Sequence, residues 1–156
     1  MNWHKTMEGY VKAKANIFRH QKEDDFLILN KENEWTDFFI KLKPKSKVLF
    51  FSEEELIIDK DEFIREWGRH NLQNFAASSL VALTLGISLE EIKKQIAGLP
   101  QIKIREEKIY DNGKMQIYND TTATSPEALT AAMERFLTAD NKVVFISGGT
   151  DRELDF

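Results

Sequence analysis

The clearest indication of fold class comes from residues 114–149, which read KMQIYNDTTATSPEALTAAMERFLTADNKVVFISGG. The stretch opens as a strand and continues as a polar loop, residues 119–124, that favours neither helix nor strand. Ser125-Pro126 is a typical helix start, and the helix is expected to reach about Leu137. β-branched and aromatic residues at 142–146 then predict a buried strand, followed by a Gly-Gly turn. This order of elements predicts a doubly wound α/β unit.

Shorter elements are expected upstream of this unit. They are a helix from Met7 to about His20 capped by Thr6, a strand at 26–30, a short helix at 35–42 and a strand at 47–52. Residues 53–69 carry only a weak pattern.

The strongest helical pattern runs from Asn71 to Leu85. Its apolar face consists of Leu72, Phe75, Ala76, Ser79, Leu80 and Leu83, at spacings of one, three and four residues. Gly86 follows, where a left-handed helix C-cap is expected. Ser88 and Glu91 then form a capping box for a second helix that ends near Ala97. The sequence therefore predicts two helices joined by a tight turn.

A boundary is expected at Gly98-Leu99-Pro100, where the helical pattern ends. Beyond it, extended residues 102–110 and 114–118 flank an Asp111-Asn112-Gly113 hairpin turn. We therefore predict two domains, residues 1–97 and 98–156. A single β-α-β unit with one hairpin cannot cover both faces of a parallel sheet, so we expect the chain to be a piece of a longer protein.

The composition is that of an ordinary globular protein. The chain has 156 residues, 42% apolar and 31% charged side chains, and a net charge of −4, which argues against a general nucleic-acid binder. It has no cysteine, which excludes disulfides, thiolate metal sites and cysteine nucleophiles. The longest apolar runs are of four residues, whereas a membrane span needs roughly 18.

Lys14 lies within an apolar stripe. Met7, Val11, Lys14 and Phe18 are spaced four, three and four residues apart, so they share one face of the predicted helix. Two interpretations are open. The side chain can extend along the apolar surface and place its amine in water. Alternatively it can be desolvated, which favours the neutral amine that can be chemically modified.

Three polar segments are candidate binding sites. His70, Asn71 and Asn74 stand at the start of the long helix, where the amides can read a heteroaromatic ring edge or serve only as cap and solvated surface. Residues 119–124 follow a strand and precede a helix, a position that suits a carboxylate or phosphate. Residues 148–152 hold the same position after the next strand. Each loop can also be an ordinary turn.

Four segments, taken in order, resemble the Mur ligases, the ATP-dependent amide-forming enzymes of peptidoglycan synthesis. They are NWHKTMEGYVKAKANIF (2–18), RHNLQNFAASSLVALTLGI (69–87), YNDTTATSPEAL (118–129) and ISGGTDRELDF (146–156). The resemblance implies an α/β fold in which residues 1–97 are the C-terminal part of a P-loop central ATP-binding domain. Residues 98–156 would then begin a Rossmann-like C-terminal ligase domain. The third segment is most similar to family members that add D-glutamate.

The resemblance also implies an activity. The parent would be a cytoplasmic, monomeric enzyme that uses ATP and Mg²⁺ and acts on small molecules, with no nucleic-acid or membrane partner. ATP would phosphorylate the terminal carboxylate of UDP-N-acetylmuramoyl-L-alanine, and the amine of D-glutamate would attack the acyl phosphate.

Site roles are carried over residue by residue. Lys14 would be carbamylated and would ligate magnesium as the catalytic lysine. Asn71 and Asn74 would hold adenine, and Asp120 would lie near the nucleotide. The carboxylates of D-glutamate would be bound by Thr122, Thr124 and Arg152.

The chain also departs from the family pattern. It contains no phosphate-binding G-x-x-G-K-[ST] run and no counterpart of the UDP-sugar domain, so the chain alone is expected to be inactive. Thr122 and Arg152 stand where lysines are common in the family. Two alternatives stay open: a sister amide ligase such as folylpolyglutamate synthase, and a non-catalytic nucleotide- or anion-binding module.

Overall fold

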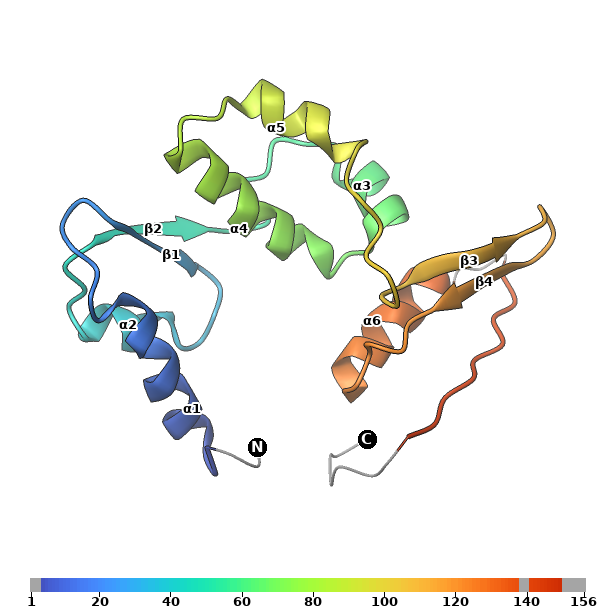
Figure 1. Ribbon diagram of the computed structural model, residues 1–156, viewed down its shortest axis with the longest axis horizontal. Helices are drawn as coiled ribbons and strands as arrows, with labels where there is room; N and C mark the ends of the chain where they lie inside the picture. The colour runs from blue at the N-terminus through green and yellow to red at the C-terminus, as the bar shows by residue number, and fades with distance from the viewer. Residues whose placement is uncertain (1–3, 138–140, 150–156) are drawn as a thin grey trace. The chain divides into compact units, whose positions relative to one another are not determined.

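The structure, a computed structural model, describes residues 4–137 and 141–149 and is of mixed α/β class, as predicted (Figure 1). The helices are α1 (Met7–Lys14), α2 (Thr36–Lys41), α3 (Lys60–Trp67), α4 (Asn71–Thr84), α5 (Leu89–Ile96) and α6 (Pro126–Phe136). The strands are β1 (Phe26–Asn30), β2 (Lys47–Phe51), β3 (Glu107–Asp111) and β4 (Gln116–Asn119). The chain packs as two units: unit 1 is Met1–Ile57 with Gln73–Ile92, and unit 2 is Ile58–Leu72 with Lys93–Phe156.

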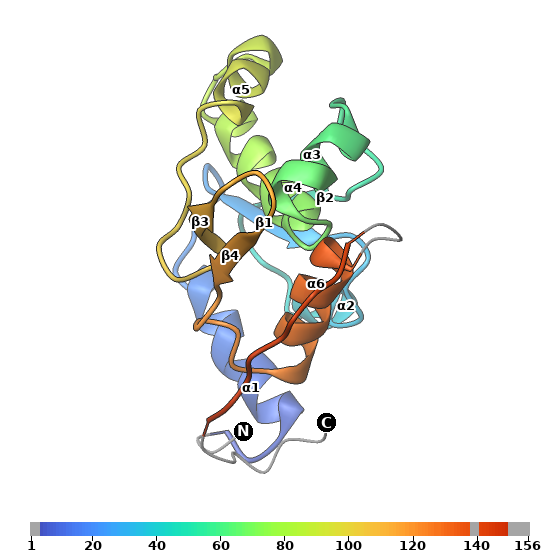
Figure 2. The same ribbon diagram turned by 90° about the vertical axis from the view of Figure 1, so that its right-hand side faces the viewer.

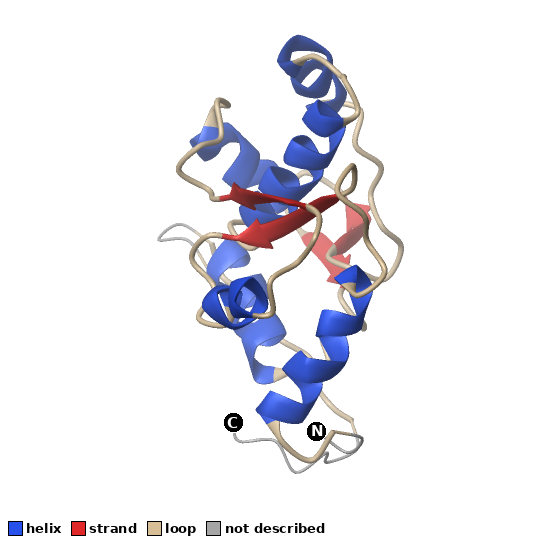
Figure 3. Ribbon diagram, turned by 90° about the vertical axis from the view of Figure 1, so that its left-hand side faces the viewer, coloured by secondary structure: helices blue, strands red, loops and turns tan. Residues whose placement is uncertain are grey.

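Unit 1 contains a β-α-β arrangement. β1 and β2 pair in parallel, from Phe26 opposite Lys47 to Asn30 opposite Phe51. They are the two front arrows in Figure 3, which point the same way. The α2 helix lies in the connection, as a parallel pair requires a crossover. The core of the unit is formed by Ala15, Phe18 and Leu27, with Leu29, Phe39 and Val48 packed against them. The predicted strands and the short helix are therefore present.

The first helix ends earlier than expected. The Thr6 hydroxyl accepts a hydrogen bond from Gly9 N at 3.1 Å, which confirms the predicted cap. The α-helix stops at Lys14, however, and the chain continues as a 3₁₀ turn over Ala15–Phe18. Such turns are frequent at helix C-termini. Both ends of this turn are buried in the core of unit 1.

The long helix and the tight turn after it are confirmed. Gly86 has a φ of +83°, the left-handed conformation expected beyond the end of α4. Ser88 and Glu91 form the capping box: Glu91 N donates to Ser88 Oγ at 3.3 Å, and Ser88 N donates to the Glu91 carboxylate at 3.0 Å. Of the predicted apolar face, Leu72, Phe75, Ala76 and Ser79 are buried and Leu83 is exposed.

Unit 2 contains a hairpin and α6. β3 and β4 pair antiparallel around the predicted turn, where Gly113 has a φ of +78°. Ser125 Oγ accepts from Ala128 N at 3.3 Å and caps α6 as predicted. The rings of Tyr118 and Phe136 lie 4.3 Å apart between centroids, which packs α6 beside the hairpin (Figure 2).

Helix α3 lies in the segment for which the sequence pattern was weak. Its N-cap, Asp59, accepts a hydrogen bond from Glu62 N at 2.9 Å through its carboxylate. The helix is only eight residues long and Phe63 is its one buried residue, so its apolar face extends over little more than one turn. The Asp59-x-x-Glu62 spacing was the available signal.

The strand predicted at residues 142–146 is not formed, and this prediction is wrong for the described structure. Residues 141–149 have no regular secondary structure, and Val144 and Ile146 are 88% and 92% exposed. A strand needs ladder hydrogen bonds to a neighbour. None of the strands in the described ranges pairs with this segment.

The predicted domain boundary between residues 97 and 98 stays a prediction. Packing groups Ile58–Leu72 with Lys93–Phe156. This grouping reflects contacts within one chain, whereas the predicted domains are those of a longer protein. The division into packing units therefore does not decide where the domains of the parent meet.

The Asp111 carboxylate stabilises the hairpin turn. It accepts hydrogen bonds from Gly113 N at 3.0 Å, Lys108 Nζ at 3.1 Å and Gln116 Nε2 at 2.8 Å. The Gly113 N–H first, and then Lys108 and Gln116, lower the pKa of Asp111 to about 2. Because this pKa is lower in the folded than in the unfolded chain, the stabilisation is complete above the unfolded-state pKa. It is lost as the pH falls through about 2.

We therefore expect acid to weaken the hairpin through Asp111. In an NMR titration the Asp111 carboxyl should have a midpoint near 2, and Asp111→Asn should reduce the loss of stability between about pH 4 and pH 2. Asp24→Asn, at an exposed position in unit 1, is the control and should leave that loss unchanged. An Asp111 midpoint near 4 would contradict the hydrogen-bonding assignment.

Candidate functional site

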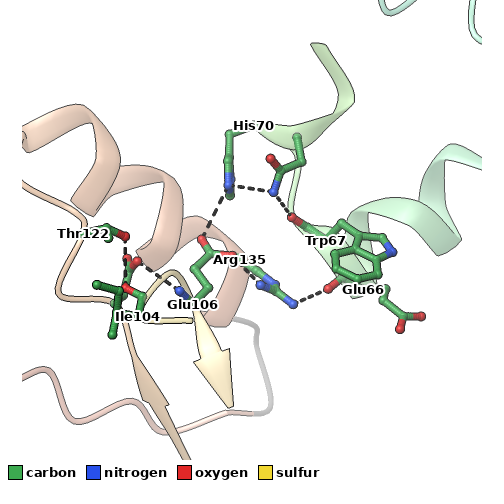
Figure 4. A network of polar contacts seen from close by, with 9 residues as sticks. Glu66, Trp67, His70, Ile104, Glu106, Thr122 and Arg135 are labelled. Carbon is green, nitrogen blue, oxygen red and sulfur yellow. Dashed lines mark hydrogen bonds and ion pairs between the residues drawn. The ribbon is translucent and has the colours of Figure 1, made fainter. Parts of the chain in front are cut away.

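Three of the predicted site residues belong to one polar network in unit 2, shown in Figure 4. Asn71 lies at the start of α4, while Asp120 and Thr122 lie in the loop between β4 and α6. Residues 104–106, just before β3, contact both places. The network therefore joins two segments that the sequence analysis singled out separately.

The loop is anchored on residues 104–106 through the backbone. The Ile104 carbonyl accepts hydrogen bonds from Thr122 N at 3.2 Å and from Thr122 Oγ1 at 3.0 Å. Glu106 N donates to the Asp120 carboxylate at 3.1 Å. Ile104 and Glu106 have φ values of +59° and +45°, a region that non-glycine residues rarely adopt. These hydrogen bonds stabilise the unfavourable backbone conformation. In it, the Ile104 carbonyl and the Glu106 N–H face the loop after β4.

A buried ion pair extends the network to α6 and α3. The Glu106 and Arg135 side chains are 7% and 14% exposed, and Arg135 Nη1 donates to Glu106 Oε2. The other terminal nitrogen of the guanidinium, Nη2, donates to the backbone carbonyl of Glu66 at the end of α3. The planar fork of arginine suits two acceptors at fixed positions. Arg135 therefore connects the C-terminal end of α3 to Glu106, in the segment before β3.

His70 and Asn71 complete the network. His70 Nε2 lies 3.8 Å from Glu106 Oε1 and 3.0 Å from Asn71 Nδ2. Asn71 Nδ2 also donates to the Trp67 carbonyl at 2.6 Å. The Trp67 carbonyl and the His70 ring together hold the Asn71 amide at the start of α4.

Gly68 makes room for the His70 ring. It has φ +81° and ψ +149°, a backbone conformation open essentially to glycine alone. A Cβ atom there would lie 2.9 Å from His70 Cε1 and 3.0 Å from His70 Nδ1. Both the backbone and the contact therefore require glycine between α3 and α4.

Gly68→Ala is expected to lower the free energy of unfolding by about 1–3 kcal/mol, the usual cost of this backbone strain. Urea unfolding followed by far-UV circular dichroism measures the change. Gly148→Ala is the matched control, because no atom lies within 4 Å of a Cβ at Gly148 and its φ is not positive. Equal stability of the two variants would contradict the strain assigned to Gly68.

Lys14 belongs to unit 1 and is exposed. Its Nζ lies 5.2 Å from the centroid of the Tyr10 ring, a cation–π contact. Val11 and Phe18 of the predicted stripe are buried, but Met7 is 42% exposed. The described residues thus match the interpretation in which the Lys14 amine reaches water.

Two of the remaining predicted site residues are described by the structure, and both are exposed. Asn74 is exposed in the first turn of α4, and Thr124 is exposed just before the cap of α6. Arg152 lies outside the described residues. Their roles stay predictions.

Glu106 and Arg135 were missed by the sequence analysis. Glu106 lies in a run of charged residues, and Arg135 looks like the solvated face of an amphipathic helix. No local spacing marks either residue as buried, because Arg135 contacts Glu106 and Glu66, which lie 29 and 69 positions away in the sequence.

The described residues provide neither a side-chain cluster for a metal ion nor a helix for a membrane span. Within 4–137 and 141–149, no group of three or more His, Cys, Asp or Glu side chains is arranged to hold a metal ion. In the same part of the chain, no helix combines the length and hydropathy needed to cross a membrane.

Comparison with known proteins gives consistent matches. The sequence profile described as Mur ligase middle domain matches residues 1–82. The UDP-N-acetylmuramoylalanine--D-glutamate ligases of Aquifex aeolicus, Hydrogenobaculum sp. and Clostridium beijerinckii are 37%, 32% and 32% identical over the whole of this chain. The chain covers 39%, 40% and 37% of those proteins, so it spans about two fifths of their length.

Two solved structures from Acinetobacter baumannii are similar in fold. A crystal structure of MurF matches with a TM-score of 0.71 over 85% of this chain and 34% of that one, at 22% identity. A UDP-N-acetylmuramoylalanyl-D-glutamyl-2,6-diaminopimelate--D-alanyl-D-alanyl ligase matches with a TM-score of 0.67 over 83% and 33%, at 21% identity. At these identities the similarity shows a common fold alone.

Proposed function

Since this chain belongs to the Mur ligase family, we propose that it is part of a longer ligase that uses ATP to join D-glutamate to UDP-N-acetylmuramoyl-L-alanine. The observation that carries the proposal is the whole-chain similarity to ligases named for D-glutamate addition in three organisms. In the proposed reaction, ATP phosphorylates the terminal carboxylate of the UDP-sugar substrate. The amine of D-glutamate then attacks the acyl phosphate, and phosphate leaves. The proposed enzyme is a cytoplasmic monomer.

We assign the nucleotide side of the site to the first turn of α4 and to Asp120. Asn71 is the first adenine contact, with its side chain held at the start of α4 by the Trp67 carbonyl and His70. Asn74 is exposed three residues further along α4 and is the second adenine contact. Asp120 accepts a hydrogen bond from Glu106 N, and we assign it a position near the nucleotide.

We assign the amino-acid side to Thr122, Thr124 and Arg152. The N–H and the hydroxyl of Thr122 both donate to the Ile104 carbonyl, which fixes the loop and with it the position of Thr124. Thr124 is exposed and can donate its hydroxyl directly. Arginine grips carboxylates through two parallel hydrogen bonds, which suits Arg152 for the same ligand.

Lys14 is the proposed magnesium ligand, as a carbamate. In its neutral form the Lys14 amine can react with carbon dioxide, and the carbamate formed is an oxygen donor of the kind that Mg²⁺ prefers. Mg²⁺ sites in phosphoryl transfer commonly use one or two carboxylates together with water and phosphate oxygens. A single carbamate therefore fits the ion without a cluster of acidic side chains. Bound Mg²⁺ would supply charge neutralisation on the transferred phosphoryl group.

Asn74→Ala in the full-length protein is expected to weaken ATP binding more than it slows the chemical step. Loss of one hydrogen bond to a neutral ring costs about 0.5–1.5 kcal/mol, or roughly a 2- to 13-fold rise in the KM for ATP. Steady-state kinetics with ATP varied measures this. Gln73→Ala, next to it on α4, is the control. An unchanged KM with a collapsed kcat would assign Asn74 to a different role.

The substrate to which the amino acid is joined distinguishes the proposed function from its alternatives. The full-length protein is incubated with ATP, Mg²⁺ and D-glutamate and either UDP-N-acetylmuramoyl-L-alanine or a folate, and products are identified by mass spectrometry. We expect an amide product only with the UDP-sugar. A folate product would favour the sister ligase, and nucleotide binding with no product would favour a non-catalytic module.

A further inference from the structure

Residues 104–106, which we call the connector, contact two separate segments of the proposed site within unit 2 (Figure 4). On one side, the Ile104 carbonyl and Glu106 N hold Thr122 and Asp120. On the other, the Glu106 carboxylate lies 3.8 Å from His70 Nε2, which is 3.0 Å from the Asn71 amide. The connector thus joins the loop after β4 to the start of α4.

The connector owes its position to Arg135. Glu106 is buried, and a buried carboxylate requires a partner charge and fixed hydrogen bonds. Arg135 supplies both and also binds the Glu66 carbonyl, so its guanidinium fixes the connector relative to the end of α3. Without this anchor, the left-handed φ values of Ile104 and Glu106 would favour relaxation of the segment.

We propose that Glu106 and Arg135 are positioning residues that align the loop carrying Asp120 and Thr122 with the nucleotide-side Asn71. This inference rests on the proposed ligase function. Neither residue needs to touch a substrate, because Glu106 acts through His70 and its backbone N–H, and Arg135 acts through Glu106. Loss of the pair should therefore weaken the binding of two different substrates together.

The test is Glu106→Gln in the full-length protein. It keeps the shape of the side chain and removes the charge that Arg135 and His70 face. We expect the KM values for ATP and for D-glutamate to rise together, each about tenfold, which corresponds to one or two misplaced hydrogen bonds. A purely structural role would lower the folded fraction and hence the apparent kcat, with both KM values unchanged. Glu134→Gln, the same change at an exposed position of α6, is the control and should leave both KM values as they are.

A second variant separates alignment from stability. Glu106→Leu/Arg135→Leu removes both charges, and replacing a buried ion pair with apolar residues is often neutral for stability. We expect this double variant to keep its melting temperature and still show both raised KM values. Normal KM values in a folded double variant would overturn the proposal, and so would loss of folding in every variant, which would indicate a structural role.

The wild-type assay separates this inference from the proposed function. If the wild-type protein forms no amide with D-glutamate, the ligase proposal fails. The alignment of Asn71 is then measured by calorimetric titration with ATP alone. A tenfold weaker ATP affinity in the folded double variant would support the inference, and an unchanged affinity would overturn it.

Discussion

Lys14→Ala in the full-length protein should lower the rate of amide formation by at least about a hundredfold. Electrostatic stabilisation of a transferring phosphoryl group by a bound metal ion is worth several kcal/mol, and the proposed carbamate of Lys14 would be a protein ligand of that ion. Alanine cannot form a carbamate. The effect should appear in kcat, because the stabilised charge develops during phosphoryl transfer.

A chemical rescue experiment and a control variant make the Lys14→Ala test specific. Bicarbonate together with a short carboxylic acid should restore part of the activity of Lys14→Ala, because a free carboxylate can occupy the position of the carbamate oxygens. Lys12→Ala is the matched control: Lys12 lies two residues away on α1, is exposed and pairs with Glu8 at 2.7 Å. Its loss should change the rate little. Near-normal turnover of Lys14→Ala would defeat the assignment.

A polypeptide of these 156 residues alone should neither hydrolyse ATP nor form an amide. Phosphoryl transfer needs backbone N–H groups and a lysine that cradle the β- and γ-phosphates beside Mg²⁺. The glycine-containing loops at Gly86, Gly98 and Gly148 lack the Gly-Lys-Ser/Thr ending of such a cradle. The start of α4 and the loop after β4 would give weak binding at most.

Phosphate release from the purified polypeptide, with ATP, Mg²⁺, D-glutamate and the UDP-sugar, tests this. The expected rate is indistinguishable from that of its Lys14→Ala variant. Sustained release above that variant would show a complete phosphate site within these residues and would refute this part of the account.

Local signals explain what could be predicted of the fold. The capping box of Ser88 and Glu91 and the left-handed Gly86 depend on residues a few positions apart, and the structure has both. The strand at residues 142–146 could not be judged in this way, because a strand depends on a partner that local composition does not specify. Val144 and Ile146 have β-forming side chains and remain exposed without such a partner.

The candidate site was predictable only in part, for the same reason. The loop with Asp120 and Thr122 was found from its place between a strand and a helix, and Asn71 from its place at a helix start. The residues that join them were not found, because the pairing of Arg135 with Glu106 and Glu66 depends on tertiary packing. The apolar pattern around Lys14 predicted that Val11 and Phe18 are buried, but it did not decide whether the Lys14 amine is buried or exposed. The core of unit 1 buries Ala15 and Phe18 and leaves Lys14 at the surface.

The most direct test of the central claim is the D-glutamate dependence of phosphate release by the full-length protein. The assay contains ATP, Mg²⁺ and UDP-N-acetylmuramoyl-L-alanine, with D-glutamate added or omitted. We expect sustained release only with D-glutamate, with one amide product formed for each phosphate. Release that is the same without D-glutamate, or that occurs without an amide product, would contradict the assignment of this chain to a D-glutamate-adding ligase.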